Sequence, residues 1–250
     1  MRLLWLNPNM TEALTAGMVE SARQAVAAGT EIIPYTAHYG VPYISSRAEA
    51  AIGARIVLEV LAEKQGEIDA AVVAAFADPG LPAARELFPF PVVGMAEAAM
   101  LTACMLGRRF SIVSFATAME PIFRECVEYN GLLGRLASIR LAGGAFSSIA
   151  SVQGEKEDAL VALAEQAVSE DGADVIVFGG APLAGLAAKV AHRISVPIVD
   201  GPAAAVKQAE ALVALAPRKA TAGTFRRPGP KPTTGLPDAL AAFIAHREPG

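Results

Sequence analysis

One unit of this chain occurs twice. The first copy spans residues 69–94 and the second spans residues 174–200. Each copy has an acidic turn, an apolar segment, a loop of small residues, a helical pattern and a second apolar segment that opens with proline. A weaker similarity relates residues 3–11 to residues 111–119. Repetition at this long spacing predicts two similar α/β lobes, whose loops would face each other across one cleft.

Short apolar runs alternate with helical patterns along most of the chain. The expected strands are residues 2–6, 31–34, 70–74, 92–94, 111–114, 138–141, 175–178 and 198–199. The expected helices are residues 11–28, 46–66, 82–87, 96–106, 120–130, 155–171, 183–192 and 238–246. Continuous apolar runs are typical of strands covered on both faces, and strand–helix alternation predicts parallel sheets with right-handed crossovers.

The composition indicates a compact globular protein. Hydrophobic residues make up 53% of the chain and charged residues only 18%, which is too apolar for a disordered protein. The net charge of −4, without a basic stripe, argues against a nucleic-acid partner. The apolar windows are shorter than the roughly 20 residues that a membrane span needs. With no signal-peptide pattern at the N-terminus, we expect a cytoplasmic protein that does not bind membranes.

The cysteines and histidines do not have the spacing of a metal site. His38, His192 and His246 have no helical partner four residues away, and Cys104 and Cys126 lie in segments with helical patterns. We therefore expect neither a metal ion nor a cofactor.

Residues 217–237 are rich in Pro, Gly and Thr and carry five basic side chains, at Arg218, Lys219, Arg226, Arg227 and Lys231. This segment reads as a solvated connector to the last helix. The alternative is a basic flap or a contact between subunits, and we expect the protein to be a homo-oligomer.

Four loops follow the expected strands and are the candidates for ligand binding. They are residues 7–11, 75–80, 114–117 and 179–182. In parallel α/β sheets, ligands bind beyond the carboxyl ends of the strands. Each loop also opens a helix, whose unpaired N–H groups favour carboxylate or imide oxygens. Four polar side chains of these loops would either meet a ligand or cap a helix: Asn9, Thr11, Asp78 and Thr117.

Several motifs in a fixed order carry a family resemblance. They are Asn7-Pro-Asn-x-Thr11, Gly40-x-Pro-x-Ile44, Asp78-Pro-Gly-Leu81, Pro91-Val-Val-Gly-x-x-Glu97-Ala and a late Gly-rich loop at residues 179–180. This set resembles the aspartate/glutamate/hydantoin racemase superfamily, and is most similar to the hydantoin and allantoin racemase branch. The resemblance implies two pseudo-symmetric, Rossmann-like α/β lobes with mostly parallel sheets. The cleft between them would hold a small carboxylate or a five-membered cyclic ureide.

We place the lobes on the chain from this resemblance. Residues 1–98 together with 206–250 would form the first lobe with a C-terminal extension, and residues 99–205 would form the second.

The chain departs from the resemblance at the reacting groups. Members of that branch use two cysteines, one from each lobe, to remove and return the α-proton on opposite faces of the substrate. Those positions fall at Ala75 and Gly180 here, so both thiols are absent. Cys104 and Cys126 cannot replace them from within helices and read as buried structural thiols. A racemase that works with two thiols is therefore excluded.

Carboxylates are the candidate replacements for the thiols. Asp78 lies in the same loop as Ala75, and Glu97 opens the helix after Gly94, so we predict both as catalytic bases once burial raises their pKa. The alternative is that Asp78 caps the helix after Pro79 and Glu97 only favours a helix start. The predicted substrate-binding residues are Asn9, Ile44, Ala75, Phe76, Thr117, Gly180 and Ala181.

Arg47 is the candidate partner for a substrate carboxylate, with a surface arginine in the first turn of a helix as the alternative.

These observations leave more than one function open. The first is an enzyme of the racemase superfamily that acts on a hydantoin-like cyclic amide or an amino-acid-like carboxylate by proton abstraction without cysteine. The second is a silent homologue that binds or senses a small molecule. The third is a lyase or hydrolase that needs a single base and acts on a similar substrate.

Overall fold

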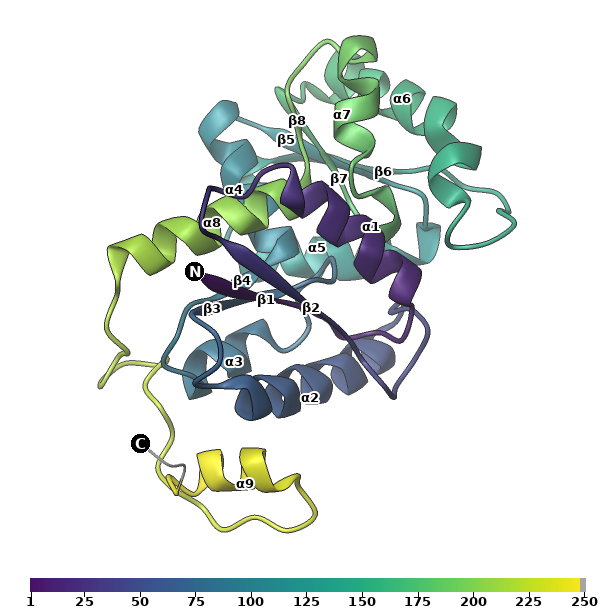
Figure 1. The fold of residues 1–250 in the computed structure, drawn as a ribbon. Helices are drawn as coiled ribbons and strands as arrows, with labels where there is room; N and C mark the ends of the chain where they lie inside the picture. Colours follow the sequence, from purple (N-terminus) through teal and green to yellow (C-terminus); the bar gives the residue numbers. More distant parts are fainter. Residues whose placement is uncertain (248–250) are drawn as a thin grey trace.

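The computed structural model describes residues 1–247, whose strands form two four-stranded parallel sheets (Figure 1). The first sheet has the order β2-β1-β3-β4, and the second has the order β6-β5-β7-β8. The strands are β1 (Arg2–Asn7), β2 (Glu31–Thr36), β3 (Ala70–Val73), β4 (Val92–Gly94), β5 (Phe110–Ser114), β6 (Leu136–Leu141), β7 (Val175–Phe178) and β8 (Ile198–Val199). The two orders are the same when β1 is matched to β5, so the repeated lobes predicted from the sequence are confirmed.

Helices connect the strands and cover both faces of each sheet. They are α1 (Glu12–Arg23), α2 (Arg47–Lys64), α3 (Leu81–Leu87), α4 (Met95–Leu106), α5 (Glu120–Tyr129), α6 (Val152–Asp171), α7 (Leu186–Val190), α8 (Gly201–Leu215) and α9 (Asp238–Ile244), with short 3-10 turns at η1 (Thr117–Met119), η2 (Leu133–Arg135), η3 (Ala181–Leu183) and η4 (Ala191–Arg193). The helix expected over residues 11–28 ends earlier, at Arg23. The helix α8 was not among the expected helices.

The two sheets share a central layer of helices. Alternate residues of β1 point to opposite faces: Leu3 and Trp5 belong to the cluster that also holds residues of α1, α4, α8, β5 and β7, whereas Leu4 packs with α2 and α3. The outer face of the second sheet packs on α6 and α7. In Figure 1, α4 and α8 lie between the lobes. The boundaries of the two lobes stay a prediction, because this central layer packs against both sheets.

The acidic turn of each repeat has the same structural role. The Asp69 carboxylate accepts a hydrogen bond from the backbone N–H of Arg2 at 2.6 Å, at the start of β1. The Asp174 carboxylate accepts hydrogen bonds from the N–H groups of Arg108 and Arg109, each at 2.9 Å, at the start of β5. Each carboxylate thus fixes the start of the strand that pairs with the first strand of its own repeat.

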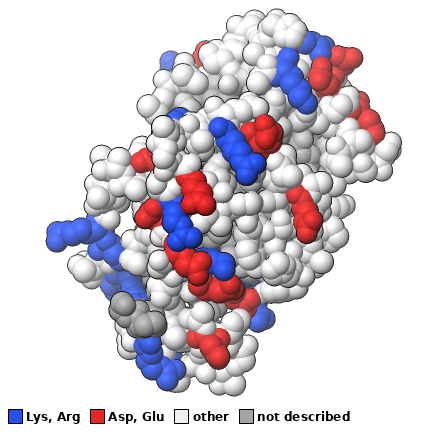
Figure 2. All heavy atoms as spheres, viewed as in Figure 1, with Lys and Arg blue, Asp and Glu red and all other residues white. Residues whose placement is uncertain are grey.

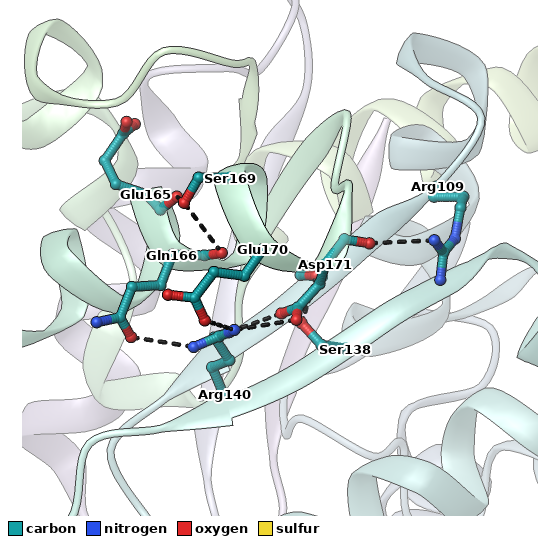
Figure 3. Close-up of polar contacts among 9 residues, drawn as sticks. Arg109, Ser138, Arg140, Glu165, Gln166, Ser169, Glu170 and Asp171 are labelled. Carbon is teal, nitrogen blue, oxygen red and sulfur yellow. Dashed lines mark hydrogen bonds and ion pairs between the residues drawn. The ribbon is translucent and has the colours of Figure 1, made fainter.

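The edge strand β6 is fixed to α6 by a network of charged side chains (Figure 3). Arg140 of β6 donates to Asp171 at 2.6 Å, to Glu170 at 2.6 Å and to Gln166 at 3.0 Å, all on α6. Arg109 donates to the backbone oxygen of Asp171 at 3.1 Å. This network lies on the outer side of the second lobe. Elsewhere on the face shown in Figure 2, acidic and basic side chains are interspersed.

The C-terminal segment runs back along the first lobe and ends in α9, which packs on α2. The ring of Phe243 lies 4.8 Å from that of Phe88, and the Arg227 guanidinium lies 4.5 Å from the centre of the Phe243 ring. Lys219 donates a hydrogen bond to the backbone oxygen of Arg85. Lys219 therefore attaches residues 217–237 to the first lobe, and Arg227 attaches them to α9.

We find no helix within residues 1–247 with the length and apolar character that crossing a membrane requires.

Candidate functional site

A cavity of about 320 Å³ lies where the loops of both lobes meet. Its lining includes Asn9 after β1, Ala75 and Phe76 after β3, residues 114–119 after β5 and residues 180–182 after β7. The four loops predicted at the carboxyl ends of the strands are therefore brought together. The loop before α2, the connection after β6, Leu14 of α1 and Phe123 of α5 complete the lining, and the connection after β6 was not expected.

The cavity gathers all of the predicted substrate-binding residues. Those lining it are Asn9, Ile44, Ala75, Phe76, Thr117, Gly180 and Ala181. The predicted bases Asp78 and Glu97 are not part of this lining. They lie at the far end of the β3 loop and in the first turn of α4.

Asn9 presents a hydrogen-bond donor to the cavity. Its Oδ1 accepts from Asn7 Nδ2 at 3.1 Å and from the backbone N–H of Thr11 at 3.1 Å. Because a backbone N–H can only donate, Oδ1 is fixed on that side, and Nδ2 is left without a partner among the described residues. Asn7 itself is fully buried, and it also donates to Thr15 at 2.9 Å. It therefore positions Asn9.

Ser114 supplies a second polar group; it lies in a candidate loop but was not among the predicted substrate-binding residues. Its side chain is fully buried at the end of β5, lines the cavity, and has no hydrogen-bond partner within residues 1–247. A buried hydroxyl without a partner costs free energy and calls for an explanation such as a ligand. A polar residue at the carboxyl end of an expected strand was the available signal.

The two positions without thiols have different backbone constraints. Ala75 is buried in the β3 loop. Gly180 has a φ of 111°, a conformation that side-chain-bearing residues rarely adopt, and a Cβ there would lie 3.2 Å from Cε1 of Phe115. The β7 loop is therefore shaped around a glycine.

Aromatic rings form much of the remaining wall. The rings of Phe76 and Phe123 meet edge-to-face at 5.2 Å, and those of Phe115 and Phe146 do so at 5.6 Å. Among the described lining residues, Tyr43 has the one titratable side chain. The cavity thus combines apolar walls with neutral hydroxyl and amide groups.

Asp78 caps α4. Its carboxylate accepts hydrogen bonds from the backbone N–H groups of Ala96 at 2.9 Å and Glu97 at 2.8 Å. Burial raises its pKa to about 7, against the opposing effect of these two hydrogen bonds. Asp78 therefore does not cap α3, the helix that follows Pro79. The N-cap of α3 is Gly80. A Cβ at Gly94 would lie 2.3 Å from Asp78 Cγ, so only glycine leaves room for this carboxylate.

Glu97 faces a different part of the surface. Both of its oxygens accept hydrogen bonds from Arg85, one of them at 2.8 Å. The pair lines a groove of about 530 Å³ beside the C-terminal segment.

Asp200 caps α8 in the second lobe, and its other oxygen accepts from the N–H of Gly185 at 2.9 Å.

The family assignment follows from comparison with known proteins. The Asp/Glu/Hydantoin racemase family matches residues 3–209. The chain belongs to this family. A hydantoin racemase from Paenarthrobacter aurescens is 36% identical over 233 residues, covering 92% of this chain and 99% of that protein.

Solved structures of similar proteins agree with this assignment. An allantoin racemase from Klebsiella pneumoniae has a TM-score of 0.89 and 35% identity, covering 96% of this chain and 98% of that one. An allantoin racemase from Pseudomonas fluorescens has a TM-score of 0.88 and 33% identity, covering 94% of this chain and all (100%) of that one.

The two thiols of this racemase-family protein lie away from the cavity. Cys104 is on α4 and Cys126 on α5, and neither lines the cavity. Burial raises the pKa of both thiols, which keeps them protonated. Within residues 1–247, no group of three or more His, Cys, Asp and Glu side chains could hold a metal ion.

Arg47 bridges the two lobes of this family member. Its Nε donates to the Glu125 carboxylate of α5 at 3.0 and 3.1 Å. Arg47 follows directly after the lining residues Tyr43, Ile44 and Ser45. Arg47 and Glu125 line a different hollow of about 250 Å³, so the guanidinium is engaged by a protein carboxylate outside the cavity.

Proposed function

We propose that the interlobe cavity binds a small, neutral cyclic amide of the hydantoin type. The observation that carries this proposal is the lining, which joins aromatic walls to the neutral polar groups of Asn9, Ser114 and Thr117. A volume of about 320 Å³ and a small number of polar groups among apolar walls are typical of small-molecule binding sites. The names of the similar proteins, hydantoin racemase and allantoin racemase, support the same class of ligand.

A neutral ligand fits better than an amino-acid carboxylate. Moving a carboxylate out of water requires a paired cation or several donors. Arg47 was the candidate partner for a substrate carboxylate, but its guanidinium is already paired with Glu125. An imide or ureide carbonyl, in contrast, needs only single neutral donors, such as Asn9 Nδ2 and the Ser114 hydroxyl.

We infer that the bound ligand is not racemised by a pair of thiols. Inversion of a carbon centre needs one base on each of its faces. The positions that the family resemblance assigns to these bases hold Ala75 and Gly180, and both line the cavity. Binding without turnover is therefore the function that this geometry supports best.

Proton abstraction without cysteine is the second candidate, and one observation favours it. The pKa of Asp78 is raised to about 7, close to the value that suits a general base at neutral pH. In this case Asp78 would exchange its capping position for contact with the ligand, with Glu97 as the second predicted base. The same site would then support isomerisation, elimination or hydrolysis with a single base.

Binding and proton exchange measured side by side separate the two candidates. Hydantoin, allantoin, aspartate and glutamate are titrated by calorimetry, and the same ligands are followed by NMR in D₂O with a protein-free control. We expect binding of the cyclic amides without deuteration at the α-carbon. Deuteration that disappears in Asp78→Asn would establish the second candidate instead. If none of the four binds, the proposed function is wrong.

We also propose that the protein is a cytoplasmic homo-oligomer. Exposed apolar side chains at the ends of α4 and α8 support association, with Met105 81% and Leu215 75% exposed. Light scattering on the purified chain would measure the oligomeric state.

A further inference from the structure

The donor that Asn9 presents to the cavity depends on the amide of Asn7. Asn7 is fully buried, and its Oδ1 accepts a hydrogen bond from the backbone N–H of Asn9 at 3.2 Å. Because that N–H can only donate, the Asn7 amide has a single orientation. Its Nδ2 then donates to Asn9 Oδ1 at 3.1 Å. The side chain of Asn9 is thus held by a second buried amide.

Thr15 supplies the second acceptor that Asn7 Nδ2 needs. An amide nitrogen carries two hydrogens, and a buried hydrogen without an acceptor costs free energy. One hydrogen goes to Asn9 and the other to Thr15 Oγ1 at 2.9 Å. Thr15 lies in α1 and is 4% exposed, so water does not readily replace its hydroxyl. The backbone oxygen of Thr11 lies 3.5 Å from the same nitrogen, which is the outer limit of a hydrogen bond.

Thr36, the last residue of β2, holds the Thr15 hydroxyl in turn. The two Oγ1 atoms are 2.6 Å apart. Since Thr15 accepts from Asn7, its own hydroxyl hydrogen is available to Thr36. Neither threonine lines the cavity, and both line a separate hollow of about 900 Å³ formed by residues of α1 and β2. A chain of side chains thus connects α1 and β2 to a group that faces the cavity.

We propose that Thr15 is a positioning residue, whose hydroxyl sets the direction of the Asn9 amide through Asn7. This inference rests on the proposed function and names a residue outside the cavity that controls the affinity for the cyclic amide. Without the hydroxyl, one hydrogen of Asn7 Nδ2 would find an acceptor only by turning toward the backbone oxygen of Thr11. That turn moves Nδ2 away from Asn9 Oδ1. Asn9 then rotates, and its donor is no longer fixed for a ligand carbonyl.

The test is a double-mutant cycle of Thr15→Val and Asn9→Ala, read by calorimetry with hydantoin or allantoin, whichever wild type binds more tightly. Valine has the shape of threonine but lacks the hydroxyl. Thr15→Val and Asn9→Ala should each lower the affinity about fivefold, the scale of one neutral hydrogen bond. In the Asn9→Ala background, Thr15→Val should change the affinity less than about twofold, because the group through which it acts is gone.

Two further variants separate the hydroxyl of Thr15 from its packing. Thr15→Ser keeps the hydroxyl and should retain nearly the affinity of wild type. Thr36→Val should give a smaller loss than Thr15→Val, because Asn7 keeps its acceptor. If Thr15→Val does not fold, Thr36→Val takes its place in the cycle.

Thr102→Val is the matched control. Thr102 also lies in a helix, α4, but it does not line the cavity, and its side chain makes no hydrogen bond within residues 1–247. This variant should bind the ligand as wild type does.

A structural role for Thr15 would give a different pattern. Equal losses from Thr15→Val in both backgrounds, or no loss in either, would overturn this inference and leave the proposed function intact. An Asn9→Ala variant that binds as tightly as wild type would do the same. Failure of wild type to bind either hydantoin or allantoin would overturn the proposed function and this inference with it.

Discussion

Two neighbouring residues of the β3 loop have backbone conformations that are unusual for their type. Ala77 has a φ of 94° and Asp78 a φ of 52°. The carboxylate of Asp78 accepts two backbone hydrogen bonds in this position. The methyl group of Ala77 makes no hydrogen bond that would offset its unusual backbone conformation. A residue with a side chain in such a sparsely populated region costs of order 1–3 kcal/mol. The strain lies between Phe76, which lines the cavity, and the carboxylate that caps α4.

We predict that Ala77→Gly stabilises the protein. Glycine adopts a φ of 94° without strain, and this gain exceeds the entropy that glycine adds to the unfolded chain. The free energy of unfolding in urea should rise by about 1 kcal/mol. Ala75→Gly is the control, because Ala75 lies in the same loop without a positive φ and should become less stable. A loss of stability in both variants would contradict the assigned strain.

The Asp78 carboxyl should make stability depend on pH. Its pKa is raised from 3.8 in the unfolded chain to about 7 in the folded protein, mainly by burial. The folded state therefore binds the proton more tightly, and its stabilising contribution is complete below pH 3.8 and is lost as the pH rises to about 7. The free energy of unfolding of Asp78→Asn relative to wild type should therefore increase between pH 3.8 and about 7. Above this window the difference between the two proteins should stay constant. Urea unfolding at a series of pH values measures the difference, and a constant difference would contradict the raised pKa.

At the scale of elements, the ion pair of Arg47 and Glu125 joins α2 of the first lobe to α5 of the second. The side chains are 65% and 52% exposed, so solvent screens the pair and it contributes little to stability. Arg47 directly follows the loop with Tyr43, and α5 carries the lining residue Phe123. The contact between these two elements is therefore weak.

We predict that Arg47→Ala speeds ligand exchange. Without the ion pair, the segment that carries Tyr43 and Ile44 is held less firmly to α5, so association and dissociation should both accelerate severalfold while the dissociation constant changes little. Stopped-flow measurements with a binding ligand report both rates. Arg124→Ala is the control, because Arg124 pairs with Glu120 within α5 alone. Equal rates in wild type and Arg47→Ala would show that the pair does not control access.

At the scale of the whole molecule, one hydrophobic cluster joins the two sheets. Trp5 of β1 and Val177 of β7 belong to it, together with residues of α4 and α8. A core shared in this way couples the lobes, because neither can lose its packing without exposing apolar surface of the other.

We predict that both lobes unfold in one transition. Trp5 is the single tryptophan of the chain and reports on the first sheet, so its fluorescence should coincide with far-UV circular dichroism during urea unfolding. Val177→Ala, a change in the second sheet, should lower the midpoint of both signals, with a loss of about 2 kcal/mol. A Trp5 signal that does not respond to this change would indicate independent lobes.

The sequence alone determined the strands, their repeated order and the loops that reach the cavity. These features depend on short apolar runs, on turns such as those at Asp69 and Asp174, and on the rule that ligands collect at the carboxyl ends of parallel strands. The helix α8 could also have been found. Asp200 at its N-cap, Pro202 in its first turn and the helical spacing of Val206, Ala209 and Val213 are all sequence signals.

Only the tertiary structure decided which polar groups face the cavity. Asp78 was predicted as a base, but its carboxylate caps α4, which begins beyond the following strand. Ser114 lies in a predicted loop but was not among the predicted binding residues, and Phe146 lines the cavity without having been predicted. Local sequence fixes the conformation of a segment, because its hydrogen bonds and apolar spacing are local. The direction and partners of a loop side chain depend instead on groups that are distant in sequence and meet only when the two lobes pack together.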